Sequence, residues 1–264
     1  MGKTTEIPWT DSTFSPWIGC QKVNDACRNC YAAALEHRWG HKTFGPDGVR
    51  RIVSEQKWRE PVRWNAQVAA ARHPRPHRVF CGSMCDVFED RRELLAPRAR
   101  LWKLIEATPA LTWLLLTKRP ENLSRLLPLR WFSPESEAGR RPFLQRNVWL
   151  MATAVTQGQV VDAMAELGDF PDAITGISVE PALGPVSFAT IERRPTFAIW
   201  GAESGPGARY APPAWARHFV IDCDIAGVMP FVKQIHIDKT RTGRPVLSRV
   251  PFEWPRALNR RELP

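Results

Sequence analysis

Three cysteines near the amino terminus have the clearest capacity for chemistry in this chain. Cys20, Cys27 and Cys30 fall within eleven residues, in the spacing C-x6-C-x2-C, and Tyr31 follows the last of them. Cysteine thiolates hold iron–sulfur clusters, whereas a structural zinc site requires four ligands. Three close thiols without a fourth cysteine nearby therefore favour a four-iron, four-sulfur cluster whose fourth iron is open to a small molecule.

Two other interpretations of the cysteines stay open. A zinc ion would need His37 or His41 as its fourth ligand, and a second C-x2-C pair, typical of zinc knuckles, is absent. The three residues could also be ordinary thiols.

Six cysteines in 264 residues are too few for a disulfide scaffold, and the N-terminus lacks the apolar segment of a signal peptide. We therefore expect a cytoplasmic protein with reduced thiols.

The elements that must position this loop alternate between strand-like and helix-like patterns. The segments with a strand pattern are 13–18, 78–84, 111–117, 147–153, 173–179, 196–201 and 228–234. The segments with a helix pattern are 31–39, 58–72 (beginning near Pro61), 90–107, 118–123, 157–168 and 212–226. Such alternation predicts an α/β fold with a parallel sheet. Seven strands predict an incomplete TIM-like (β/α) barrel, with a doubly wound open sheet as the second choice.

The domain organisation predicted from these patterns is simple. Residues 1–234 are expected to form a single barrel domain, and residues 235–264 a basic C-terminal extension that packs on it or trails from it. Residues 129–146, rich in Pro, Arg, Ser and Gly, are expected to form a surface excursion.

Polar and small residues collect directly after the predicted strands. In parallel α/β folds the carboxyl ends of the strands carry the active site. The cysteine loop also follows a predicted strand, so it belongs to the same set. The remaining candidates are Gly82, Ser83, Asp86, Thr117, Lys118, Thr153, Glu180, Gly201, Glu203, Ser204, Arg209 and Lys233.

The loop 201–209 is the most informative of these after the cysteines. Its glycines let the backbone approach a ligand closely and expose N–H groups to an anion. Glu203 and Arg209 are expected to pair with each other or to address polar groups of a ligand. The loop lacks both the GK[ST] ending and the G-x-G-x-x-G spacing of phosphate-binding fingerprints.

The formal net charge of +10 favours acidic partners such as nucleic acid, phosphorylated metabolites or an anionic cofactor. It also supports an alternative function, that of a nucleic-acid-binding protein whose cysteines form a zinc knuckle. No run of apolar residues is long enough for a membrane span, so no membrane partner is expected. The scattered cysteines Cys81, Cys85 and Cys223 are expected to be mostly core residues.

An ordered set of motifs carries a resemblance over nearly the whole chain. The motifs are Gly19-Cys20, Cys27-Arg-Asn-Cys30-Tyr31, Gly82-Ser-Met-Cys-Asp86-Val-Phe88, Leu116-Thr-Lys-Arg-Pro120, Glu180-Pro-Ala-Leu-Gly-Pro185, Gly201-Ala-Glu-Ser-Gly-Pro-Gly-Ala-Arg209 and Phe231-Val-Lys-Gln234. The set resembles a phage- and prophage-associated radical-SAM-like family of unknown function. The chain departs from the commonest superfamily spacing, C-x3-C-x2-C, and lacks its Gly-Gly-Glu pattern.

This resemblance implies a barrel of the radical SAM type in which Cys20, Cys27 and Cys30 hold a [4Fe-4S] cluster. It implies that S-adenosyl-L-methionine binds the open iron and is cleaved to a 5′-deoxyadenosyl radical, with one electron from a flavodoxin- or ferredoxin-like reductant. The substrate is unidentified, and the phage association points to a nucleic acid or a nucleotide.

The resemblance also suggests roles for the strand-end residues. Gly82 and Ser83 would hold the methionyl amine, with Asp86 in place of the missing acid. The remaining cofactor contacts would come from Thr117 and Lys118 with its neighbour Arg119, from Thr153 and Thr156 at the ribose, and from Gly201, Ser204 and Arg209. Glu180, Glu203 and Lys233 are the catalytic candidates.

Overall fold

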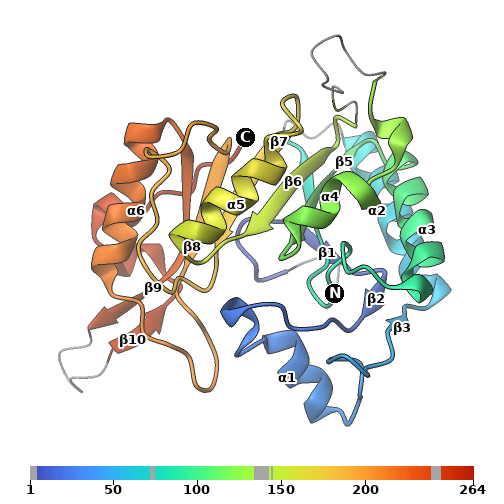
Figure 1. Ribbon diagram of the computed structural model, residues 1–264, viewed down its shortest axis with the longest axis horizontal. Coiled ribbons are helices and arrows are strands. Elements are labelled where there is room, and N and C mark those ends of the chain that lie inside the picture. Colours follow the sequence, from blue (N-terminus) through green and yellow to red (C-terminus); the bar gives the residue numbers. More distant parts are fainter. Residues whose placement is uncertain (1–4, 72–74, 134–142, 144, 239–244) are drawn as a thin grey trace. The chain divides into compact units, whose positions relative to one another are not determined.

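The structure is a computed structural model that describes residues 5–71, 75–133, 143, 145–238 and 245–264 (Figure 1). Its contacts divide the chain into two compact units. The first comprises Met1–Met151 with Asp169–Ala173, and the second comprises Ala152–Gly168 with Ile174–Pro264. Each unit has its own strands, helices and core.

Parallel strands form the centre of the first unit. β1 (Ser12–Phe14) pairs in parallel with β4 (His77–Cys81), which pairs in parallel with β5 (Leu111–Thr117). β6 (Val148–Thr153) follows β5 in the strand order and continues into the second unit. β5 is almost continuously buried, which is why its sequence is an unbroken apolar run.

Helices and short turns surround these strands. The α-helices are α1 (Tyr31–Arg38), α2 (Glu55–Ala71), α3 (Leu95–Glu106) and α4 (Leu123–Leu126). The 3₁₀ turns are η1 (Asp25–Cys27), η2 (Arg92–Leu94), η3 (Pro120–Asn122) and η4 (Leu129–Trp131), and β2 (Trp17–Ile18) pairs antiparallel with β3 (Arg51–Ile52). α2 and α3 lie side by side (Figure 1), and the Arg100 guanidinium of α3 stacks 4.3 Å from the Trp58 ring of α2.

Tryptophans fill much of the core of the first unit. Phe14 of β1 contacts the rings of Trp58 and Trp113 edge-on, with centroids 5.4 and 5.8 Å away. Trp102 of α3 contacts Trp131 in the same geometry. These pairs join strands and helices that are distant in sequence, and each aromatic pair adds about 0.5–1.5 kcal/mol beyond its buried area.

The second unit repeats the strand–helix alternation. After the end of β6 come α5 (Gln157–Leu167), β7 (Ile174–Val179), β8 (Phe197–Gly201), α6 (Pro213–Ala226), β9 (Met229–Asp238) and β10 (Pro245–Ser248). β7, β8 and β9 are parallel neighbours, and β10 pairs antiparallel with β9. α6 packs against β8 and β9 and ends at Gly227, whose φ of 70° is the usual left-handed stop.

The described part of the C-terminal segment is packed on the second unit. Besides β10, it contains the turns η5 (Pro251–Glu253) and η6 (Arg256–Leu258). Val232 N–H donates to the Arg260 carbonyl at 2.8 Å, and Glu262 N–H donates to the Pro230 carbonyl at 3.0 Å. Leu258 is fully buried. The described residues of the segment 245–264 thus make backbone and core contacts within the second unit.

The mixed α/β class and the mostly parallel strands are confirmed, but several boundaries differ, and three of the differences have a clear cause. The first predicted strand is two strands, because the chain turns at Ser15–Pro16, where proline has no N–H to donate. α2 begins at Glu55 and contains Pro61, because Ser54 accepts the bonds that open the helix. β9 extends to Asp238, four residues beyond the prediction, because β10 covers its end.

Much of the predicted surface excursion at 129–146 (residues 134–142 and 144) lies outside the described residues. The described part is not all surface, because Trp131 and Phe143 are buried against each other. Across the described chain, no helix combines the length and the apolar character needed to cross a bilayer.

Replacing Leu114 by alanine tests the core of the first unit. Leu114 of β5 is fully buried, so Leu114→Ala should lower the free energy of unfolding in urea by about 2–5 kcal/mol. Leu129→Ala is the matched control, because that side chain is 73% exposed and its loss should cost less than about 0.5 kcal/mol. Equal losses in the two variants would contradict the placement of β5.

Candidate functional site

The three cysteines lie on one loop of the first unit, and each has a different environment. Cys20 follows β2 and Gly19, Cys27 ends η1, and Cys30 is the residue that precedes α1. All three are free thiols; Cys27 is buried and the other two are partly exposed. Cys30 itself makes no side-chain hydrogen bond that caps α1.

Gly19 determines how the chain enters this loop. Its φ is +116°, and a Cβ there would stand 2.2 Å from the Thr43 carbonyl oxygen, so no other residue fits. Its N–H donates to the Met84 carbonyl at 3.0 Å, and it forms a parallel bridge with Cys85. The start of the cysteine loop is therefore attached to the segment that follows β4.

Asp86 organises that segment, although it was predicted as a cofactor ligand. One carboxylate oxygen accepts from the Phe88 N–H at 3.0 Å and the Thr117 hydroxyl at 2.8 Å. The other accepts from the Lys118 N–H at 3.0 Å and the Arg119 guanidinium at 2.9 Å. Four donors occupy its acceptor positions, so this buried carboxylate joins the end of β4 to the end of β5.

Arg119 connects Asp86 to the cysteine loop. Its guanidinium donates to Cys20 Sγ at 3.5 Å and to the Gln21 carbonyl at 2.7 Å. The side chain is largely buried and also lies 4.0 Å from Glu89. Arg119 was predicted, together with Lys118, as a contact for the cofactor or an anionic substrate, and here it connects the strand ends to the first cysteine.

Glu89 and Arg50 complete a buried ion cluster that the sequence analysis missed. Arg50 donates to Glu89 through Nε at 2.8 Å and Nη2 at 2.6 Å, and to the carbonyls of Thr43, Gly45 and Gly48. Glu89 in turn accepts from the Gln21 N–H at 3.1 Å. With Asp86 and Arg119, the cluster holds two positive and two negative groups. We call these four residues the ion cluster.

Burial, more than the charges around it, decides the protonation of Cys20. Burial raises the pKa of this thiol to about 12, because it disfavours the thiolate, and Asp86 adds to the effect. Arg119 opposes that rise, and Glu89 reinforces it. Cys20 is therefore a neutral thiol in the structure, and metal binding would have to displace its proton.

Gly82 and Ser83 lie close to the cysteine loop at the end of β4. Gly82 has a φ of +100°, and the Tyr31 hydroxyl donates to the Ser83 carbonyl at 2.5 Å. The Ser83 hydroxyl is 3.4 Å from that of Ser15. The structure thus gathers the candidates Gly82, Ser83, Asp86, Thr117 and Lys118 around the loop, and the Thr117 hydroxyl is engaged by Asp86.

The described residues contain no group of three or more His, Cys, Asp or Glu side chains that could hold a metal ion as they stand. One of the two histidines considered for zinc, His41, is paired through Nδ1 with buried Glu36 at 3.1 Å.

Cys81 and Cys223 are fully buried, and burial raises the pKa of both thiols, so their expected place in the core is confirmed.

The second unit brings together two of the predicted catalytic residues. Lys233 Nζ lies 2.8 Å from Glu180 Oε1, so the end of β7 is joined to β9 across β8. Gly201 at the end of β8 makes room for this pair, because a Cβ there would stand 2.4 Å from Glu180 Oε1. Any larger residue at position 201 would require the Glu180 side chain to move away from this position.

The loop after β8 is closed by the expected pairing of Glu203 with Arg209. The Glu203 carboxylate accepts from Arg209 Nη2 at 2.6 Å, and from its Nε and its backbone N–H, both at 2.8 Å. Glu203 is buried and Ser204 is partly exposed. Thr153 is buried at the end of β6, and Thr156 caps α5 by accepting from the Gln159 N–H.

Comparison with known proteins leaves the function open. A family model described as a protein of unknown function (DUF5131) matches residues 4–247. No curated protein matches the chain, and no solved structure matches it.

The ion cluster makes the stability of the first unit sensitive to Glu89. Glu89→Gln would leave Arg50 and Arg119 buried with a single carboxylate, which should cost about 3 kcal/mol of unfolding free energy in a urea titration. Glu93→Gln is the matched control, because Glu93 is half-exposed and should give no measurable change. A Glu89→Gln protein as stable as the control would contradict the cluster.

His236 of β9 should make stability fall in mild acid. Its pKa is lowered, mainly because burial disfavours the charged ring, and Nδ1 accepts from the Ala211 N–H at 3.1 Å. The unfolded chain, with a histidine pKa of about 6.5, therefore binds more protons, so stability is full above that pH and declines below it. Urea titrations at two pH values, about 7.5 and 5.5, should show a smaller decline in His236→Gln. An unchanged decline would exclude this histidine as its source.

Proposed function

We propose that this chain, which belongs to the DUF5131 family of unknown function, is an iron–sulfur enzyme of the radical S-adenosylmethionine type. The observation that carries the proposal is the attachment of Cys20 to the ends of β4 and β5 through Arg119 and Asp86. A cysteine held in this way lies where parallel α/β folds place their chemistry.

The donor set fits such a cluster. Cys20, Cys27 and Cys30 are free thiols on one loop, and soft thiolate ligands favour Fe–S clusters or zinc. Zinc would need a fourth ligand, and His41 is engaged with Glu36. Metal sites commonly assemble only as the metal binds, so the three thiols would converge during loading.

A bound cluster together with S-adenosylmethionine would supply reductive cleavage of a carbon–sulfur bond. The product would be a carbon radical that abstracts hydrogen. Arg119 orients Cys20 and offsets the negative charge that its thiolate would add next to Asp86 and Glu89. Gly82 and Ser83 would supply polar backbone groups next to the loop, whereas the Lys118 N–H is already donated to Asp86. These residues position and bind; they do not carry the redox chemistry themselves.

In the second unit, Glu180, Lys233 and Glu203 are the groups we propose for substrate chemistry, with Thr153, Gly201, Ser204 and Arg209 as binding residues. The parallel order of the strands within each unit supports an incomplete barrel of the radical SAM type. The net charge of +10 supports an acidic, flavodoxin- or ferredoxin-like electron donor and a substrate related to nucleic acid.

Anaerobic reconstitution with iron and sulfide tests the proposal. The wild-type protein should bind about four irons and four sulfides and turn brown, because the three thiolates hold the cluster. Cys30→Ala should lose most of the iron, whereas Cys223→Ala, which removes a buried thiol of the second unit, should keep it. With dithionite and S-adenosylmethionine, the loaded wild-type protein should release 5′-deoxyadenosine.

Two results would count against the proposal. A colourless protein with one bound zinc would favour the zinc-knuckle alternative, which steeply salt-dependent binding to DNA or RNA would then support. An iron content equal in the Cys30→Ala and Cys223→Ala proteins would show that the cysteine loop does not hold the cluster.

A further inference from the structure

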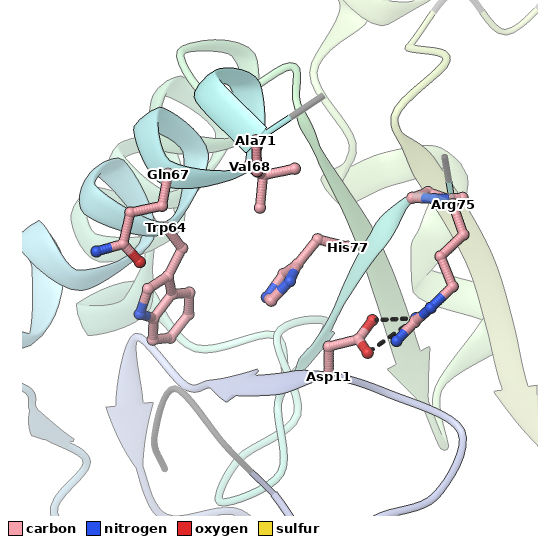
Figure 2. Close-up of a pocket in the computed structure, with 8 residues that line it drawn as sticks. Asp11, Trp64, Gln67, Val68, Ala71, Arg75 and His77 are labelled. Atoms are coloured by element: carbon pink, nitrogen blue, oxygen red, sulfur yellow. Dashed lines mark hydrogen bonds and ion pairs between the residues drawn. The ribbon is translucent and has the colours of Figure 1, made fainter. Parts of the chain in front are cut away.

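Trp39, at the carboxyl end of α1, is the most exposed tryptophan of the chain. It is 57% exposed, whereas the other tryptophans, all in the part of the chain that the structure describes, are buried apart from the partly exposed Trp215. Trp64, for comparison, lines a small pocket between α2 and the start of β4 (Figure 2), but it is only 4% exposed, so no face of its ring is free. Trp39 can therefore stack on a flat ring that approaches from solvent.

Two cations flank this exposed indole. Arg38 is the last residue of α1 and Lys42 follows it by four positions. Both are exposed, and neither side chain pairs with another described residue. Residues 31–42 contain one acidic residue, Glu36, whose side chain is buried and lies 3.2 Å from the Arg51 guanidinium. The positive charge beside the indole is therefore not balanced by this segment.

Arg38, Trp39 and Lys42, which we call the α1 end surface, suit a partner that combines negative charge with exposed flat rings. Phosphate groups attract guanidinium and ammonium groups, and every base has a face that stacks on an aromatic side chain. An acidic peptide would satisfy the two cations but would bring no base to the indole. A duplex would bring phosphates, but its bases are stacked on each other. A single strand supplies both features at once.

We propose that the α1 end surface binds single-stranded nucleic acid. Trp39 stacks on one base, and Arg38 and Lys42 contact the neighbouring phosphates.

The location of this surface connects it to the cysteine loop. α1 begins directly after Cys30, and its eight residues span about 12 Å (Figure 1). A strand bound at the far end of α1 can therefore extend along the helix to the loop. There Arg28, between Cys27 and Cys30, is exposed and its guanidinium has no partner among the described residues. That the bound strand is the substrate rests on the proposed function, whereas its binding does not require iron.

Replacing Trp39 tests the stacking contact. Fluorescence anisotropy of labelled oligodeoxythymidine and oligouridine measures binding to the full chain, prepared without iron and kept reduced. Trp39→Ala should weaken binding at least about fivefold, the equivalent of about 1 kcal/mol of stacking. Trp39→Phe keeps a stacking ring and should recover part of this loss. Because the residue is exposed, thermal unfolding should show that both variants fold.

Replacing the two cations tests the phosphate contacts. The double variant Arg38→Gln with Lys42→Gln should reduce the slope of log affinity against log salt by about 1.4, or about 0.7 for each contact on a single strand. Arg63→Gln with Lys103→Gln is the matched control. It removes one exposed arginine and one exposed lysine from α2 and α3, away from α1 (Figure 1), and should leave the slope unchanged.

Four results would overturn the proposal. They are no oligonucleotide binding at about 50 mM salt, equal affinities of the wild-type and Trp39→Ala proteins, equal salt slopes of the two double variants, and binding of a duplex or of polyglutamate as tight as that of the single strands. Iron content after reconstitution is measured separately. Failure to bind oligonucleotides therefore leaves the cluster proposal standing, and failure to bind iron leaves the α1 end surface standing.

Discussion

The ion cluster of Arg50, Asp86, Glu89 and Arg119 is the constraint on which the candidate site depends. Burying one unpaired charge costs several kcal/mol, so such groups are stable only when each charge has a partner. Here two guanidinium groups and two carboxylates balance each other, and backbone groups occupy many of the remaining positions. The cysteine loop is attached to this cluster at Cys20 and Gln21.

The cluster explains why the loop has two different halves. The Cys20 end is attached to the strands through buried charges, whereas Cys27 and Cys30 are set by local turns, η1 and the start of α1. A long first gap between the cysteines separates the anchored end from the locally folded end. The six residues between Cys20 and Cys27 therefore connect the part of the loop that is bound to the strands to the part that folds locally.

Long strands and helices could be predicted from the sequence because each pattern is local. β5 is the clearest case, since a strand buried on both faces must be apolar throughout. The pairing of Glu203 with Arg209 could be named from the sequence as one of two options, because the two residues are six positions apart in a glycine-rich loop. The pairing of Arg50 with Glu89 could not be predicted, because 39 positions separate them and both lie in polar segments without a periodic pattern. Glu180 and Lys233 were each selected as a strand-end residue, but their contact depends on which strands are neighbours.

The C-terminal segment has a consequence for how the protein can be handled. β10 covers the outer edge of β9 from Ile235 to Asp238, and the chain near Arg260 to Glu262 covers it from Pro230 to Val232. An uncovered strand edge offers a row of N–H and C=O groups to other chains and promotes aggregation. Removing residues 245–264 would expose this edge of β9, so these residues protect the protein from self-association through β9.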